Sequence, residues 1–214
     1  MERLDTSRKR LTFLIYTALA LGIASYAVLY LFGDPKLANR FDVSFANANM
    51  SAIPGHFFFG GVALLLTPLQ LSDTIRLRWR SLHRLTGLLY TIAVFIAGVS
   101  ALLIAPRAQG GMVSVAGFTT LALLWLGSTA LAWQRALMMD FANHARWMYR
   151  SVALTSSAIT LRILLGLGVP VAKLPLELVY STASWAAWII NLAVCEYFFV
   201  PRADKHQASN PRSV

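Results

Sequence analysis

LTGLLYTIAVFIAGVSALLIA, residues 85–105, is the stretch that decides the fold, because it carries no charge over a length that can cross a bilayer. A helix needs roughly 20 apolar residues to span about 30 Å of hydrocarbon. Five more predominantly apolar runs occur, at residues 11–32, 53–71, 112–133, 148–168 and 182–200. They lack the polar–apolar alternation of membrane β-strands, and hydrocarbon admits only helices and closed barrels. The sequence therefore predicts an all-α, polytopic membrane bundle with six transmembrane helices.

The composition leaves room for one membrane domain. The 214 residues are 57% hydrophobic and 13% charged, whereas soluble domains are nearer one quarter charged. We expect a single domain over residues 11–200, between a cytoplasmic N-terminal segment, 1–10, and a disordered cytoplasmic tail, 201–214. The net charge of +10 does not indicate nucleic acid binding, because the basic residues are scattered among loop ends. A lipid bilayer with anionic headgroups is the expected partner.

The basic residues alternate between the gaps that separate the apolar runs. Of the 19 Lys and Arg residues, 14 lie in the N-terminal segment, around the gaps after the second and fourth runs, and in the tail. Only 4 lie in the opposite gaps. The positive-inside rule then places both termini in the cytoplasm. We expect a multi-pass protein of the bacterial inner membrane.

Two ionisable residues fall well inside the predicted spans, where charge is expensive and usually faces the bundle interior. Arg162 lies in the outer third of the fifth run, and Glu196 lies near the inner end of the sixth. Their depths differ too much for the two side chains to pair, at about 1.5 Å per residue. Arg150, at the inner end of the fifth run, is the better partner for Glu196. Structural ion pairs or snorkelling would explain these charges without a functional site.

Small and polar residues recur at helical spacing on three of the predicted helices. The stripes are His56, Gly60, Thr67 and Gln70; His83, Gly87, Tyr90, Val94, Gly98 and Ala101; and His144, Met148, Ser151, Thr155, Ala158, Arg162 and Gly166. Steps of three and four residues place each set on one helix face. We therefore expect spans two to five to form a four-helix core. Close packing of small residues, with hydroxyls bonding between helices, explains such stripes; a polar cavity or cofactor slot would be a functional addition.

Two histidines at the inner ends of the third and fifth helices are the leading candidates for a site. Ser81 and Asp140 can cap these helices, which places His83 and His144 at matched depth, where they can approach each other. Imidazole is a natural axial ligand of haem iron, and Gly87 would offer space for a porphyrin. The cations available for its propionates are Arg80, Arg84, Arg146 and Arg150. The leading hypothesis is a small redox protein that holds b-type haem or a quinone near the cytoplasmic face.

Other interpretations remain open. The two histidines can instead bind backbone groups or lipid headgroups, or a non-haem metal together with Asp140 or Glu196, although their spacing is not a metal signature. A non-enzymatic transporter, or an accessory subunit of a larger membrane complex, would use His56 and Arg162 as an outer polar layer. A lipid- or sterol-like ligand between the small-residue stripes is a further alternative. No Ser, Cys or Lys nucleophile has a supporting base nearby in sequence. The sequence therefore does not decide whether the protein is an enzyme.

Four segments, in this order, carry a resemblance to a known family. They are His56 to Gly60, Thr67-Pro-Leu-Gln70, Arg78 through His83-Arg84-Leu-Thr-Gly87 to Tyr90, and His144-Ala-Arg-Trp147-Met148-Tyr-Arg150-Ser151. Together they resemble a bacterial family of multi-pass membrane proteins that is known only as a domain of unknown function, over about residues 52–168. Thr67 departs from the small residue, such as Gly, that the pattern has before the proline. The resemblance implies a membrane bundle whose histidines and arginines share a common core, and it implies no reaction.

Overall fold

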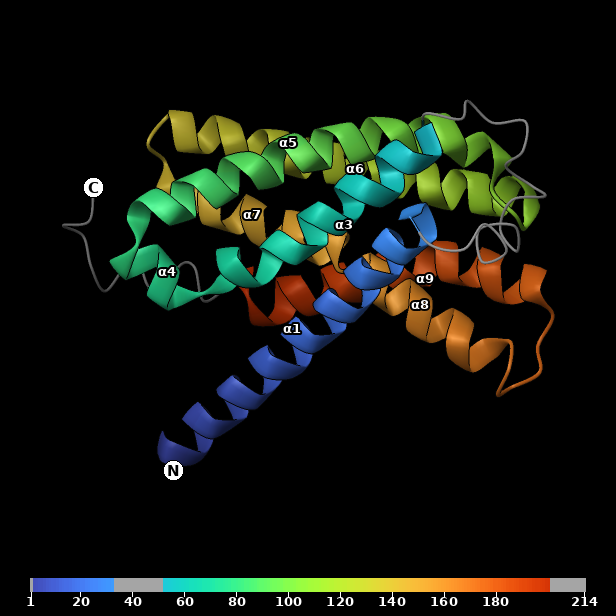
Figure 1. Ribbon diagram of the computed structural model, residues 1–214, viewed down its shortest axis with the longest axis horizontal. Helices are drawn as coiled ribbons and strands as arrows, with labels where there is room; N and C mark the ends of the chain where they lie inside the picture. The colour runs from blue at the N-terminus through green and yellow to red at the C-terminus, as the bar shows by residue number, and fades with distance from the viewer. Residues whose placement is uncertain (1, 33–51, 201–214) are drawn as a thin grey trace.

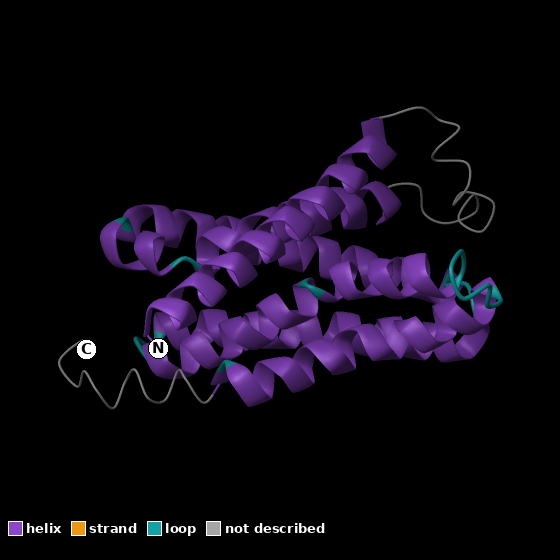
Figure 2. Ribbon diagram, turned by 90° about the horizontal axis from the view of Figure 1, so that it is seen from below, coloured by secondary structure: helices purple, strands orange, loops and turns teal. Residues whose placement is uncertain are grey.

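The computed structural model describes residues 2–32 and 52–200, and these residues form helices without any strand. The predicted disordered tail, 201–214, lies outside the described residues. The helices are α1 (Glu2–Phe32), α3 (Ala52–Leu71), α4 (Asp73–Arg78), α5 (Arg80–Ile104), α6 (Gly111–Leu137), α7 (Phe141–Thr155), α8 (Ser157–Gly168) and α9 (Leu176–Phe198), with a 3-10 turn at Ala105–Arg107. Figure 2 shows the described residues as a bundle of helices, with short loops at its two ends and one further break within it.

The six predicted spans are confirmed within the described residues. Six helical segments are long and apolar enough to cross a membrane, and α7 and α8 together form the fifth. That span is interrupted at Ser156, whose hydroxyl donates to the carbonyl of Val152 at 2.7 Å. Such back-bonding by Ser often bends helices, and α8 turns away from the axis of α7 beyond this point (Figure 1).

One end of the bundle carries most of the arginines, and we call it the basic end. It holds the start of α1, the short helix α4, the turn between α6 and α7, and the end of α9 (Figure 1). Both ends of the described chain therefore lie on the same side, as an even number of spans requires. The positive-inside rule predicts that this side faces the cytoplasm. The other end, which holds the α5–α6 and α8–α9 connections, is called the opposite end below.

The predicted four-helix core of spans two to five is confirmed. The largest buried apolar cluster combines residues of α3, α5, α6 and α7. Its members are Ala63, Tyr90, Ala93, Val94, Ala97, Trp125, Val152 and Leu154. Helix α9 packs along α6, α7 and α8, whereas α1 contacts α3 and α8 and crosses the bundle obliquely (Figure 1).

The outward faces of the spans are apolar, as a bilayer requires. On α5, Tyr90 and Val94 are fully buried, whereas Leu88 is 40% and Val99 is 51% exposed. A water-soluble helix would place polar residues on that outer face. Hydrocarbon outside and close packing inside therefore account for a helix that is apolar all around.

The predicted cap at Ser81 is wrong. Helix α5 begins at Arg80, so Ser81 lies inside its first turn, and Trp79 occupies the cap position without a side-chain bond. The preceding residues form α4, which Ser72 caps by accepting from the amide of Ile75 at 3.4 Å. Because α4 leads directly into α5, the latter starts earlier than the apolar pattern indicates.

Candidate functional site

A small cavity of about 70 Å³ lies at the basic end, between the ends of α3, α5 and α7. Its polar lining consists of Gln70, Asp73, Arg76, His83, His144 and Tyr149. Leu71, Met148 and Val152 supply its apolar surface. The expected approach of His83 and His144 is confirmed, because both line this one cavity.

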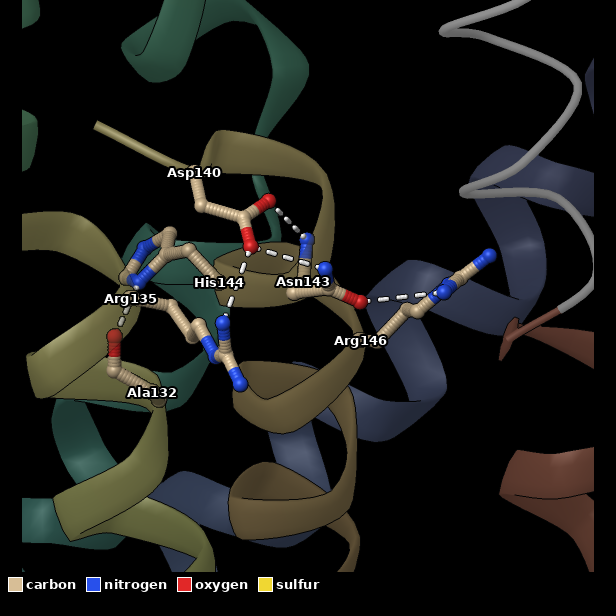
Figure 3. A network of polar contacts seen from close by, with 6 residues as sticks. All are labelled: Ala132, Arg135, Asp140, Asn143, His144 and Arg146. Atoms are coloured by element: carbon tan, nitrogen blue, oxygen red, sulfur yellow. Dashed lines mark hydrogen bonds and ion pairs between the residues drawn. The ribbon is translucent and has the colours of Figure 1, made fainter. Parts of the chain in front are cut away.

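The ring of His144 is held in a defined orientation by a hydrogen bond to α6. Its Nδ1 lies 2.8 Å from the carbonyl oxygen of Ala132 on α6 (Figure 3). A carbonyl can only accept, so Nδ1 carries the proton of this bond. In the neutral ring the other nitrogen, Nε2, then has a free lone pair. Neutral His144 therefore has Nε2 available to accept a hydrogen bond or to coordinate a ligand.

Asp140 organises the turn that carries His144, and its predicted capping role is confirmed. One carboxylate oxygen accepts from the amide of Asn143 at 3.2 Å, and the other accepts from the Asn143 side chain at 2.8 Å and from Arg135 at 3.3 Å (Figure 3). The Asn143 bonds, with a smaller contribution from Arg135, lower the pKa of Asp140 below its ordinary value. Asn143 in turn accepts from Arg146 at 3.0 Å.

His83 contributes a buried nitrogen that has no partner. Among the described residues, its Nδ1 has no hydrogen-bond partner. Its backbone carbonyl accepts from the side-chain nitrogen Nε2 of Gln70 at 3.2 Å, and the same nitrogen donates to the Thr86 hydroxyl at 2.6 Å. An unsatisfied buried polar atom is unfavourable, so a ligand that bonded to Nδ1 would remove a penalty that the protein otherwise bears.

A hydroxyl cluster occupies the middle of the bundle, beyond the apolar wall of the cavity. Tyr90 on α5 bonds to Ser151 and Thr155 on α7, each at 2.7 Å. Thr129 bonds to Ser151 at 2.6 Å, and the indole of Trp125 donates to Thr155 at 2.9 Å. The polar stripes of the third and fifth spans thus meet, as the sequence predicts, in a network that is bonded throughout.

A second tyrosine attaches the first span to the bundle. The hydroxyl of Tyr16 donates to Thr67 on α3 at 2.7 Å and also bonds to Ser156 at 2.9 Å. Thr67 is fully buried and donates to the carbonyl of Leu64 at 2.7 Å. A hydroxyl at position 67 therefore serves as an acceptor for α1, which a glycine there would not provide.

At the opposite end, His56 and Arg162 form the predicted outer polar layer. His56 Nδ1 lies 3.0 Å from the carbonyl oxygen of Ala97 on α5. Arg162 stands over the ring of Tyr26 with 5.6 Å between its Cζ and the ring centroid. The guanidinium is within electrostatic range of His56, which confirms that the two side chains lie at a similar depth.

The described part of the chain contains no group of three or more His, Cys, Asp or Glu side chains placed to hold a metal ion. His83 and His144 therefore have no carboxylate that completes a three-ligand set with them. Glu196, considered above as such a ligand, is engaged elsewhere: Arg150 Nε lies 2.6 Å from its carboxylate. Asp140 is occupied by the helix cap and Arg135.

The sequence profile of one family, described as Predicted membrane protein (DUF2306), matches residues 53–199. The chain belongs to this family. The predicted resemblance is confirmed and extends beyond residue 168 to the end of α9. No curated protein and no solved structure matches the chain.

The DUF2306 match contains the whole cavity, the hydroxyl cluster and both residues of the outer polar layer, whereas Tyr26, which contacts Arg162, lies on α1 outside the match. Helix α1 lies outside the match. The cavity and its two histidines therefore belong to the family domain. Helix α1 packs on this domain through contacts with α3 and α8.

The cations expected around a cofactor do not line the cavity of this DUF2306 protein. Arg84 is exposed, Arg146 joins the network around Asn143, and Arg150 forms a two-point pair with Glu196 at 2.6 and 3.1 Å. The predicted Arg150–Glu196 pair is thus confirmed. Arg150 also lies 4.6 Å above the ring of Trp147.

Two charged residues of the cavity, Asp73 and Arg76, are not marked as site residues by the sequence pattern. They lie on α4 and pair at 2.6 Å. Their spacing of three residues on a helix is a recognisable signal for a pair. Their position beside the histidines depends on α4 folding back below the cavity, which the sequence does not specify.

Proposed function

We propose that this DUF2306 protein is a small membrane redox protein whose cavity at the basic end binds the head group of a quinone. The observation that carries the proposal is the pair of imidazoles in one cavity: His144 with a free Nε2, and His83 with an unpartnered buried Nδ1. With both termini assigned to the cytoplasm, this cavity faces the cytoplasmic side of the bacterial inner membrane.

The chemistry of the lining suits a quinone in both of its oxidation states. A quinone carbonyl accepts hydrogen bonds, which His83 can donate when Nδ1 is protonated. A hydroquinone hydroxyl donates, and His144 Nε2 can accept. Leu71, Met148 and Val152 provide the apolar contact that the ring and its lipid tail require. Ligand sites generally combine such apolar walls with a few oriented polar groups.

The size of the cavity favours entry by one edge of the ring. An apolar cavity of about 150 Å³ encloses benzene, and the present cavity is about 70 Å³. The carbonyl edge would therefore lie between the imidazoles, with the remainder of the ring in the cavity mouth. The ends of spans lie at the depth of the membrane interface, where quinone head groups have access.

Binding of decylubiquinone to the purified full-length protein in detergent tests this proposal. We expect saturable quenching of tryptophan fluorescence in the unaltered protein, and binding about fivefold weaker in His83→Ala and in His144→Ala, since each loses about one hydrogen bond. His56→Gln, which removes an imidazole at the opposite end, is the matched control and should bind normally. Absence of saturable binding, or equal weakening in all three variants, would refute the proposal.

A b-type haem is the second candidate, because the fixed Nδ1 of His144 leaves Nε2 directed away from its anchoring carbonyl, as an axial ligand requires. The space beside Gly87 is occupied by Gln70: a Cβ added at Gly87 would meet Gln70 Oε1 at 3.3 Å. A porphyrin beside Gly87 would therefore need the Gln70 side chain to move. A Soret band in protein purified from haem-replete cells, lost in His144→Ala, would establish haem in place of a quinone.

A further inference from the structure

Arg162 places a cation within the membrane-spanning part of α8. It is half-buried on α8, six residues before Gly168, and thus about 9 Å from the helix end at ~1.5 Å per residue. Charges at such depths are unfavourable and are normally paired. Among residues 2–32 and 52–200, no carboxylate lies within ion-pair distance of its guanidinium.

The groups around Arg162 orient the cation without neutralising it. The ring of Tyr26 on α1 supports the guanidinium from one side at 5.6 Å, and Tyr180 on α9 and His56 on α3 lie within electrostatic range. Tyr180 is itself packed edge-on against Phe118, with 5.4 Å between the ring centroids. A cation–π contact uses one face of the guanidinium and leaves its in-plane N–H donors available.

His56 adds no negative charge to this layer. Its Nδ1 bonds to the carbonyl oxygen of Ala97 at 3.0 Å, so this nitrogen carries the proton. The described surroundings of Arg162 are therefore two phenols and one imidazole from three different helices. A guanidinium fork in such a setting is matched by an oxyanion that can accept two N–H bonds at once.

We propose that Arg162 is a binding site for a phosphate group at the outer face of the membrane, with Tyr26 holding the guanidinium in place. The planar fork of arginine fits phosphate oxygens in a two-point contact that lysine cannot reproduce. An arginine side chain is long enough to reach from this depth toward the interface, where the headgroup layer and soluble phosphate compounds are the two candidate sources of phosphate. This site lies at the opposite end from the quinone cavity and does not depend on it.

Lipid and phosphate binding to the full-length protein tests the site. Delipidated protein is titrated with phosphatidylglycerol or phosphatidylcholine and examined by native mass spectrometry. Separately, inorganic phosphate is added to protein in phosphatidylcholine nanodiscs while the melting temperature is recorded. A lipid source predicts a preference for phosphatidylglycerol and no response to phosphate. A soluble source predicts a rise in melting temperature with phosphate.

Three substitutions decide the role of Arg162 in whichever assay responds. Arg162→Gln should weaken binding about tenfold, which corresponds to ~1.4 kcal/mol. The binding affinity of Arg162→Lys should be intermediate between that of Arg162→Gln and that of the unaltered protein. The matched control is Arg107→Gln, which removes an exposed arginine at the same end of the bundle and should leave binding unchanged. If Arg162→Gln does not fold, Tyr26→Leu is measured in its place. We expect its binding affinity to be about threefold lower, because the cation–π contact is removed.

Two results would overturn the proposal. One is that the unaltered protein, Arg162→Lys and Tyr26→Leu all bind phosphatidylglycerol with the same affinity and all respond to phosphate to the same extent. The other is strong thermodynamic coupling of Arg162 to Asp34 or Asp42 in a double-mutant cycle, because the counter-ion would then belong to the chain itself.

Discussion

Replacement of Tyr90 by phenylalanine measures the contribution of the hydroxyl cluster to the stability of the bundle. The ring of Tyr90 is fully buried, and phenylalanine keeps that ring while removing only the hydroxyl. Two bonds of 2.7 Å, to Ser151 and Thr155, are lost. A hydrogen bond between membrane helices contributes about 0.6 kcal/mol on average and about 1.7 kcal/mol at most. Two such bonds predict a loss of about 1–2 kcal/mol in the free energy of unfolding.

The remaining contacts of the cluster keep the expected loss within this range. Ser151 retains its bond to Thr129 at 2.6 Å, and Thr155 retains the indole of Trp125 at 2.9 Å. Neither hydroxyl is left without a partner, so the larger penalty of an unsatisfied buried group does not apply. Tyr90→Ala, in contrast, would also open a cavity and should cost about 3–5 kcal/mol.

Unfolding in mixed detergent micelles with increasing dodecyl sulfate provides the measurement. Tyr197→Phe is the matched control, because Tyr197 is 76% exposed and its hydroxyl lies outside the cluster. A double-mutant cycle with Thr155→Val should give a coupling of about 0.6–1.7 kcal/mol. If Tyr90→Phe and Tyr197→Phe have the same unfolding midpoint, the cluster does not stabilise the packing of α5 against α7, and our account of the core is wrong.

Three further predictions concern other parts of the fold. The folded pKa of Asp140 is below its unfolded value, so this residue stabilises the protein above about pH 3.9 and ceases to do so as the pH falls through the folded pKa. The melting temperature of the unaltered protein should therefore decrease in acid more than that of Asp140→Asn, and equal acid responses would contradict this. Glu196→Gln breaks a two-point arginine pair at a partly exposed position, and should lower the unfolding free energy by only about 0.5–1 kcal/mol in the same detergent titration; a loss several times larger would indicate a desolvated pair. Gly117→Ala would place a Cβ 2.6 Å from Ser184 Oγ and 3.0 Å from its carbonyl oxygen, forcing α6 and α9 apart at about 1–3 kcal/mol; the control Gly127→Ala has nothing within 4 Å, and similar midpoints for the two variants would show that the helices are not in close contact.

The topology was predictable because it follows from length and charge along the chain. Each apolar run is long enough to span hydrocarbon, and the basic gaps alternate. The pairing of Arg150 with Glu196 was predictable for a similar reason: a helix rises by a constant ~1.5 Å per residue, so depth can be read from position. The same reasoning placed His56 beside Arg162 and rejected an Arg162–Glu196 pair.

The side chains that surround the two histidines could not be predicted, because no sequence pattern indicates which residues of different helices come into contact. A glycine such as Gly87 indicates close approach of some group, and the group that approaches is Gln70 of α3. The arginines nearest in sequence to the histidines are directed to Asn143, to Glu196 or outward, whereas Arg76 of α4 lines the cavity. Side chains one residue apart on a helix point in directions about 100° apart, so proximity in sequence does not imply a shared site.

By itself the sequence determined the number of spans and the relative depths of Arg150, Arg162 and Glu196, because these depend only on hydrophobic length and helical rise. The tertiary structure alone decided which groups of equal depth meet. The rotation of each helix about its axis and the fold of α4 bring His83 beside His144, close the space at Gly87 with Gln70, and leave Arg162 on the ring of Tyr26. Rotation is set by packing between helices that are distant in sequence, and a single sequence carries no direct record of it.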